Sequence, residues 1–162
     1  MPTIEVSYRD LVNLIGKKID MRNLENDLLY AKAEIDGVAG DTIKLDVKDT
    51  NRPDLWSAEG VAREIRFRYK KDFPKYKTKK SGVTVYVDKG VAGVRPLTVC
   101  AVVRGLKIDP IVLSQLIQLQ DKVSGTFGKN RKEVAIGVYD LHKIKPPIKY
   151  TTFGRKEIKF VP

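Results

Sequence analysis

The segment Asp49–Tyr69, DTNRPDLWSAEGVAREIRFRY, joins a polar turn directly to the most regularly patterned helix of the chain. Pro53 fixes its own φ and drives Arg52 toward extended backbone, which neither a helix nor a central strand accommodates. Asn and Asp flank this pair in the sequence Asn51-Arg52-Pro53-Asp54, and both residue types favour turns. We therefore predict a turn at residues 51–54 that leads straight into a helix.

The helix that follows should be amphipathic. Asp54 or Ser57 can accept hydrogen bonds from its first free N–H groups. Helical spacing then places Trp56, Val61 and Ile65 on one apolar stripe, which predicts a helix packed against a core. On pattern alone, its three arginines would simply be solvated on the remaining surface.

The amino-acid sequence of this segment resembles that of a known family. NRPDLWSAEGVARE resembles the segment NRPDL.S.EG.ARE near the start of the β subunit of phenylalanine–tRNA ligase, in its archaeal and eukaryotic form. Bacterial members insert an oligonucleotide-binding barrel in this domain. The direct run from Val47 to Asn51 leaves no room for one, which favours the archaeal or eukaryotic branch.

The first part of the chain alternates between strand and helix patterns. A strand is predicted at 3–6, a helix capped by Ser7 with Asp10 and ended by Gly16, a second helix at 21–29, and a hairpin with strands at 31–36 and 43–47 around a turn at Gly37–Gly40. Together with the helix after residue 54, these elements predict a small α+β domain over residues 1–70. Residues 71–82 follow as a basic linker, because they are rich in lysine and have no periodicity.

Residues 83–162 are predicted to form part of a mixed α/β domain. Asp109 followed by Pro110 marks a helix start, and the helix should reach about Val123. Its buried side is predicted to carry Val112, Leu113, Leu116 and Ile117, and its wet face Gln115, Gln118 and Gln120. Strands are predicted at 83–87, 97–103, 134–138, 148–151 and 158–161. Cys100, in the apolar run 97–103, is then expected to be a buried, inert thiol.

This second part resembles the opening of the editing domain in the same β subunit, through VRPLTVCAVVRGL and LIQLQDKVSGTFGKNRKEVAIGVYDLHKIKPP. The resemblance thus covers nearly the whole chain. In the family, the editing domain continues well past this point and further modules follow it. We therefore expect the chain to be the amino-terminal part of such a subunit, inactive as an isolated stretch.

The resemblance implies a ligase that charges tRNA(Phe) with phenylalanine using ATP and Mg²⁺, and edits mischarged tyrosyl-tRNA(Phe). It implies an α subunit as partner, with two α and two β subunits in the enzyme. ATP and Mg²⁺ are expected for the whole enzyme and none bound by this stretch. A non-catalytic RNA-binding module, or a module that docks other proteins, is the alternative.

The charge distribution independently favours a polyanionic partner. The net charge is +11, and residues 61–80 alone carry +7 whereas residues 1–60 carry −4. The predicted RNA-binding residues are Lys129, Asn130, Arg131 and Lys132, in the glycine-bearing loop SGTFGKNRK. With Gly125 and Gly128 this loop could shape a phosphate-binding site, or it could be a plain basic hairpin tip.

No catalytic or metal-binding residue is predicted. The single cysteine and the single histidine, His142, exclude a Cys/His zinc site and leave His142 as a surface imidazole. One cysteine also permits no intrachain disulfide, which is typical of a reducing compartment. No leader and no long apolar run are seen, so we expect a cytoplasmic protein with no membrane and no DNA partner.

Overall fold

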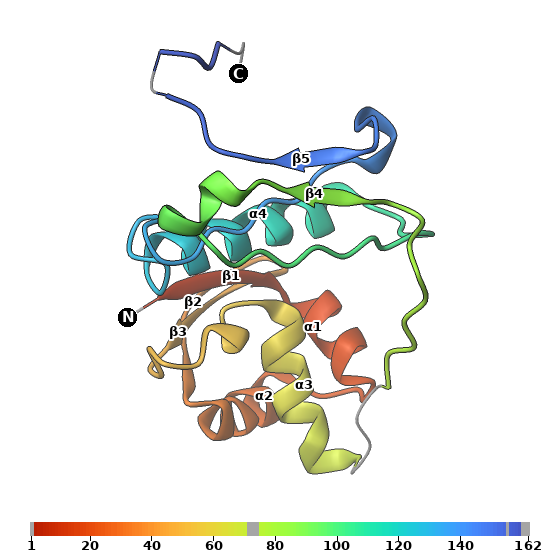
Figure 1. Cartoon of the computed structure of the whole chain (residues 1–162). Helices are drawn as coiled ribbons and strands as arrows, with labels where there is room; N and C mark the ends of the chain where they lie inside the picture. Colours follow the sequence, from red (N-terminus) through yellow and green to blue (C-terminus); the bar gives the residue numbers. More distant parts are fainter. Residues whose placement is uncertain (1, 71–74, 155, 160–162) are drawn as a thin grey trace. The chain divides into compact units, whose positions relative to one another are not determined.

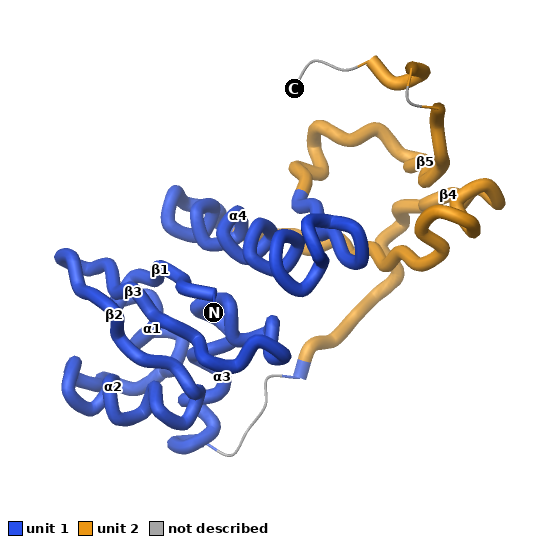
Figure 2. The backbone as a smooth tube through the Cα atoms, turned by 90° about the vertical axis from the view of Figure 1, so that its left-hand side faces the viewer, with its two compact units in different colours: residues 1–75, 107–138 blue, residues 76–106, 139–162 orange. Residues whose placement is uncertain are grey.

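The computed structural model describes residues 2–70, 75–154 and 156–159. Its backbone divides into two compact units, which Figure 2 shows in blue and orange. Unit 1 comprises residues 1–75 and 107–138, and unit 2 comprises residues 76–106 and 139–162. The boundaries expected from sequence, at 1–70, 71–82 and 83–162, stay a prediction, and residues 71–74 of that linker lie outside the described residues.

Unit 1 is built on a three-stranded antiparallel sheet with strand order β1-β3-β2. Its strands are β1 (Thr3–Ser7), β2 (Ala33–Ala39) and β3 (Thr42–Val47), as the alternating pattern predicted. The hairpin turns later than expected, at residues 40–41, where Gly40 takes a left-handed φ of 60°. Gly37 instead lies inside β2, at a β-bulge where the pairing register shifts.

Two helices and a short 3₁₀ turn follow β1 and pack on the sheet with α3 (Figure 1). Helix α1 (Tyr8–Ile15) begins at Ser7, whose hydroxyl accepts from Asp10 N–H at 3.1 Å, and ends at the left-handed Gly16. Helix α2 (Met21–Leu28) is capped by Asp20 and runs into the 3₁₀ turn η1 (Leu29–Ala31). The apolar faces of these elements form one buried core, which includes Ile4, Val6, Leu11, Ile15, Leu24, Leu28, Ile43, Leu45 and Ile65.

The segment after β3 forms two short pieces of helix in place of one. Pro53–Leu55 is a 3₁₀ turn, η2, and α3 (Ala58–Tyr69) begins after Ser57, whose hydroxyl accepts from Gly60 N–H at 3.1 Å. Of the two predicted caps, Ser57 is therefore the one used. Trp56 lies between the two pieces, outside α3, and is the largest fully buried side chain, 1% exposed.

Helix α4 (Pro110–Gly125) begins at Asp109 as predicted, with Asp109 Oδ1 accepting from Val112 N–H at 2.9 Å. The prediction of its two faces was only partly right, since Val112 and Leu116 are half-buried. Leu113 and Ile117 are about half exposed, whereas Gln115 is buried and donates to Asp10 Oδ2 at 3.1 Å.

The sheet explains why α4 turns glutamine side chains inward. Strand β1 is an edge strand, so Glu5 has a backbone N–H and C=O with no neighbouring strand to pair with. The carboxamide of Gln118 accepts from Glu5 N–H at 2.7 Å and donates to Glu5 C=O at 2.9 Å. Gln120 likewise accepts from Val138 N–H. An amide side chain can replace a missing strand, and a leucine cannot, so the glutamine side of α4 faces β1 within unit 1.

Unit 2 contains a two-stranded parallel sheet of β4 (Val85–Val87) and β5 (Ile148–Tyr150), with 3₁₀ turns η3 (Lys89–Gly93) and η4 (Leu141–Lys143). The strands predicted at 97–103 and 134–138 do not form, and residues 158–159 are not in a strand; residues 160–161 lie outside the description. Strands need a pairing neighbour, and none is seen beside these segments within the described residues. Cys100 is consequently exposed, and its predicted burial was wrong.

The fold class predicted from sequence, a small α+β domain followed by partial mixed α/β structure, is confirmed. Across the described ranges, no helix combines the length and apolarity needed to cross a membrane.

Candidate nucleic-acid interface

The basic loop after α4 is held to the last turn of that helix by backbone hydrogen bonds. Gly128 N–H donates to Val123 C=O at 2.7 Å, Asn130 N–H to Gly125 C=O at 3.1 Å, and Arg131 N–H to Ser124 C=O at 2.8 Å. These bonds require three consecutive left-handed residues, Lys129, Asn130 and Arg131, with φ of 48°, 56° and 66°. Non-glycine residues adopt this conformation at a cost, so the surrounding bonds hold the loop in one shape.

Close packing at Gly128 adds to this rigidity. A Cβ atom there would lie 2.1 Å from Val134 C=O, closer than any side chain allows. The fully buried Ser124 accepts from Ile136 N–H at 3.2 Å, which fixes the chain that leaves the loop. The loop backbone is therefore held in one conformation, which fixes the positions from which its side chains extend.

The structure brings the four predicted residues, Lys129 to Lys132, together on one exposed turn. Lys129 Nζ lies 3.4 Å from Glu133 Oε1, and Arg131 Nη2 lies 3.3 Å from Asp121 Oδ1. All of these side chains are more than half exposed, so the pairs are weak and can exchange for phosphate oxygens. The arrangement suits attraction of a phosphate backbone by side-chain charge.

The backbone of the loop does not suit a phosphate cradle. Such a site needs several free N–H groups that point to one spot. Here the N–H groups of residues 128–133 all donate to carbonyl oxygens of the same segment. The sequence-based suggestion of a phosphate-binding loop that includes Gly125 and Gly128 is therefore wrong for the backbone, and any contact with phosphate has to come from side chains.

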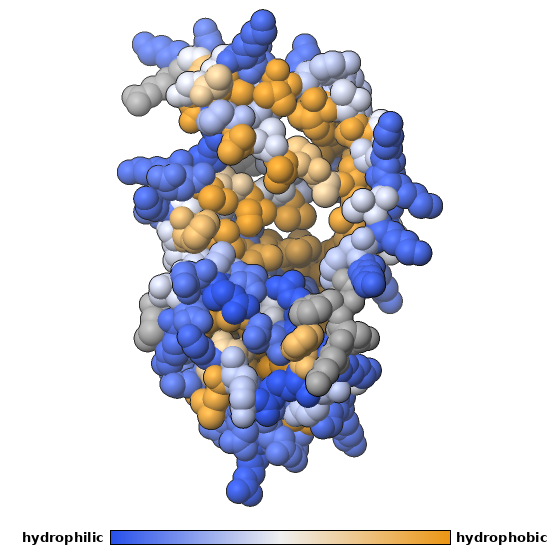
Figure 3. All heavy atoms as spheres, turned by 60° about the horizontal axis from the view of Figure 1, so that its bottom comes forward, coloured by the Kyte–Doolittle hydropathy of each residue, from blue (hydrophilic) through white to orange (hydrophobic). Residues whose placement is uncertain are grey.

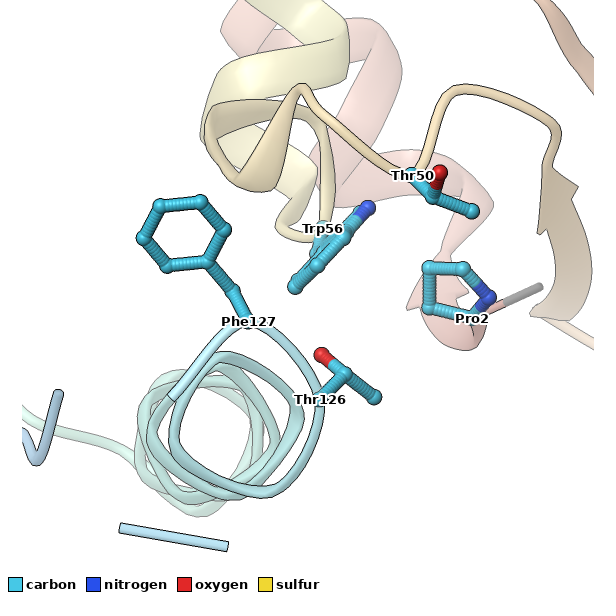
Figure 4. A pocket seen from close by; sticks show the side chains of 5 residues that line it. All are labelled: Pro2, Thr50, Trp56, Thr126 and Phe127. Atoms are coloured by element: carbon cyan, nitrogen blue, oxygen red, sulfur yellow. The ribbon is translucent and has the colours of Figure 1, made fainter. Parts of the chain in front are cut away.

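An aromatic pocket lies next to this loop. Thr126 and Phe127 form one side of a cavity of about 340 Å³, and Pro2, Thr50 and Trp56 form the other. Figure 4 shows the rings of Phe127 and Trp56 at its edge, with the two threonine side chains beside them. Phe127 is half exposed, so it offers a flat apolar surface within the same turn as the basic side chains. Sequence analysis did not identify this pocket, because its two walls are at least 70 residues apart in the chain.

The polar residues of the turn at 51–54 are used inside the protein. Arg52 makes a bidentate pair with Asp54, both N–O distances being 2.9 Å, and reaches Glu64 at 3.1 Å. Arg63 adds a second contact to Asp54 at 3.2 Å. The hydrogen bonds from Arg52 hold the pKa of Asp54 below its usual value. This network ties η2 to α3, so two of the segment's arginines are paired and not simply solvated.

The network leads to a prediction about acid. Because the folded-state pKa of Asp54 is lowered, its contribution to stability is present above the usual value of 3.8 and disappears as pH falls through the lower folded value. Asp54→Asn should therefore unfold at lower urea concentration than wild type at pH 7, and at the same concentration in acid below the lowered pKa of Asp54. Asp36→Asn, which alters an exposed pair with Lys44, is the control and should show no difference at either pH. A difference for Asp54→Asn that persists in acid would contradict this account.

His142 is almost fully exposed and its Nδ1 lies 3.3 Å from Asp140 Oδ1, as expected for a surface imidazole. Within residues 2–70, 75–154 and 156–159, no group of three His, Cys, Asp or Glu side chains is placed to hold a metal ion.

Comparison with known proteins identifies what the whole chain resembles. It is 52% identical over its full length to the phenylalanine–tRNA ligase β subunit of Pyrococcus horikoshii, and 51% identical to that of Thermococcus kodakarensis. It spans 30% and 29% of the length of these curated relatives. No family model matches the chain.

A solved structure agrees with these relatives. The crystal structure of an N-terminal fragment of the phenylalanyl-tRNA synthetase β subunit from Pyrococcus horikoshii superposes with a TM-score of 0.86 at 52% identity. The alignment covers 93% of this chain and 45% of that fragment.

Proposed function

Since the chain is homologous over its whole length to the amino-terminal part of archaeal phenylalanine–tRNA ligase β subunits, we propose that it serves this part in such an enzyme. The enzyme would charge tRNA(Phe) with phenylalanine and remove tyrosine attached by mistake. Editing is needed because an apolar pocket cannot strongly reject an analogue that adds one hydroxyl. A cytoplasmic assembly of two α and two β subunits completes the proposal.

In this enzyme we assign the chain a role in holding RNA, with no part in the chemistry. ATP and Mg²⁺ would bind in other parts of the whole enzyme. The observation that supports RNA contact is the exposed turn Lys129–Lys132, held rigid beside the aromatic pocket. A rigid basic turn loses little entropy on meeting a phosphate backbone.

The test is the salt dependence of binding to tRNA(Phe). A variant with Lys129→Gln, Arg131→Gln and Lys132→Gln should bind more weakly, and the slope of log affinity against log salt should fall by about 2, since each phosphate contact contributes roughly 0.7 to 0.9. Fluorescence anisotropy with labelled tRNA measures both quantities.

The control removes the same charge from another surface of unit 1. Lys32→Gln, Lys44→Gln and Lys48→Gln alter lysines in or next to the β2–β3 hairpin that pair with carboxylates, as Lys129 and Arg131 do, and Lys32 shares the left-handed backbone of the loop residues. Its slope should stay close to that of wild type. Equal slopes for the two triple variants would show that the loop makes no specific contact.

A further inference from the structure

A second group of basic and aromatic side chains lies at the far end of α3, away from the basic loop. The guanidinium carbon of Arg68 lies 3.2 Å from the ring centroid of Tyr30, and Lys17 Nζ lies 3.6 Å from that of Tyr69. These side chains come from three different places: the second residue after α1, the turn η1, and the last turn of α3. We call the set Lys17, Tyr30, Arg68 and Tyr69 the tyrosine platform.

A buried carboxylate holds the platform in place. Asp27, on α2, is only 4% exposed, and its Oδ1 lies 3.2 Å from Arg68 Nε. Its other oxygen accepts a hydrogen bond from the Tyr69 hydroxyl. That hydrogen bond raises the pKa of Tyr69, so the phenol stays neutral and remains a donor. One buried anion thus fixes the positions of a guanidinium and an aromatic ring.

The platform remains open to solvent although its members are fixed. Tyr30 is 64% exposed, and Tyr69 and Arg68 are each about one third exposed. Arg66 Nη1 and Lys70 Nζ approach Gly16 at the end of α1, next to Lys17 and Lys18. The side of unit 1 that carries α2 and α3 comes forward in Figure 3, where hydrophilic residues predominate. Arg68 therefore lies against Tyr30 and Lys17 against Tyr69, and Arg66 and Lys70 lie near Gly16 beside Lys17.

This combination has a recognised chemical use. Single-stranded nucleic acid is bound by positive side chains that follow the backbone and by aromatic or guanidinium planes on which unpaired bases stack. A surface that only attracted phosphate would need no exposed ring, and a surface that docked an apolar protein would not be ringed by cations. Fixing the rings before binding lowers the entropy lost on contact.

We propose that the tyrosine platform binds an unpaired segment of RNA, with a base stacked on Tyr30 and the flanking phosphates on the lysines and arginines at the ends of α1 and α3. This site is separate from the loop at 129–132 and does not depend on the proposed enzyme. It takes its selectivity for unpaired RNA from stacking, which a duplex cannot offer.

The test uses the 162-residue chain and a labelled oligouridylate, with an RNA duplex as the second probe. Tyr30→Ala should weaken oligouridylate binding about tenfold, whereas Tyr30→Phe, which keeps the ring, should stay within about twofold of wild type. Duplex binding should change little in either variant. Tyr86→Ala is the matched control, because Tyr86 is equally exposed, at 60%, but lies in unit 2.

The charged part of the proposal is tested separately. Lys17→Gln with Lys18→Gln should lower the salt slope for oligouridylate by about 1.4, since single strands contribute roughly 0.7 per contact. Thermal unfolding of each variant shows whether the fold is intact, which is expected because these side chains are exposed.

Two outcomes would overturn the platform. Unchanged oligouridylate binding by Tyr30→Ala would exclude stacking there and leave the surface to a protein partner. An equal loss in Tyr86→Ala would show that the effect is not local. The triple glutamine variant of the basic loop separates the two sites. Adding Tyr30→Ala to it should weaken oligouridylate binding further, as it does in the wild type. If substitutions at one of the two surfaces leave binding unchanged, the proposal for that surface fails and the other stands.

Discussion

Gly60→Ala should destabilise the chain by about 3 kcal/mol or more, although alanine is the better helix former. Gly60 lies in the first turn of α3, where a Cβ atom would lie 1.5 Å from Asp54 C=O and 2.7 Å from its carbonyl carbon. Both atoms belong to the backbone of η2, so no side chain can move to make room. Relief of the clash must separate η2 from the first turn of α3, the turn in which the Ser57 hydroxyl accepts from Gly60 N–H.

Urea unfolding followed by the fluorescence of Trp56, the only tryptophan, measures this effect. Gly125→Ala is the control. Gly125 also lies in a helix, α4, but a Cβ atom added there would have no neighbouring atom within 4 Å. It should leave stability unchanged or raise it by up to about 1 kcal/mol. Similar effects of the two substitutions would mean that the close approach at Gly60 is not a constraint.

Trp56→Ala should cost about 3–5 kcal/mol, the range for removing a large aromatic side chain from a core. The indole is 1% exposed and belongs to the same buried cluster as Leu55, Val61 and Ile65. Its Nε1 donates to Asp49 C=O at 3.4 Å, a long and weak bond, so most of the loss comes from packing.

Circular dichroism in urea measures this loss, since the variant has no tryptophan. Tyr76→Ala, which truncates an aromatic ring that is 82% exposed, should change stability by less than about 0.5 kcal/mol. In the wild type, native emission from Trp56 should be blue-shifted and poorly quenched by acrylamide. Emission that is already red-shifted and fully quenchable would place the indole in water and contradict the structure.

Local signals in the first 70 residues predicted the strands and most of the helix starts and ends. Ser7, Asp20, Ser57 and Gly16 act through their nearest neighbours in sequence, and strands β1 to β3 alternate cleanly because one face is buried. The break between η2 and α3 escaped prediction, because the spacing of Trp56 fits a continuous helix. The break lies at Ser57, whose backbone is extended, with φ of −145° and ψ of 156°. The close approach at Gly60 then lets η2 pack against α3, and periodicity does not encode that contact.

Patterns in the second half were misleading where the partner was distant or missing. Helix α4 has an apolar side, yet an edge strand more than 100 residues earlier selects its glutamine side. Gln115 and Gln118 are spaced three apart, which is the one sequence signal that places them on a common face. The apolar run at 97–103 has strand composition, but composition alone does not pair a strand.

The candidate site was predicted in part. The four residues of the basic turn were identified from charge, and the structure places them together on one exposed turn; their contact with RNA remains a prediction. Phe127 and its pocket, the left-handed backbone, and the platform around Asp27 depend on contacts between distant segments. Composition and spacing therefore predict where the charged side chains lie in the sequence. They do not predict the contacts that hold those side chains in place.

The measurement that tests the account most directly is the release of tyrosine from tyrosyl-tRNA(Phe) by purified residues 1–162. The account assigns this chain RNA binding and no reacting group, so the chain should bind the tRNA with a steep salt dependence while release proceeds at the rate seen in buffer. The loop and platform variants should change binding and leave that rate unaltered. Release well above buffer that survives moderate salt and is lost on heating would show a hydrolytic site within this chain, and would contradict the account.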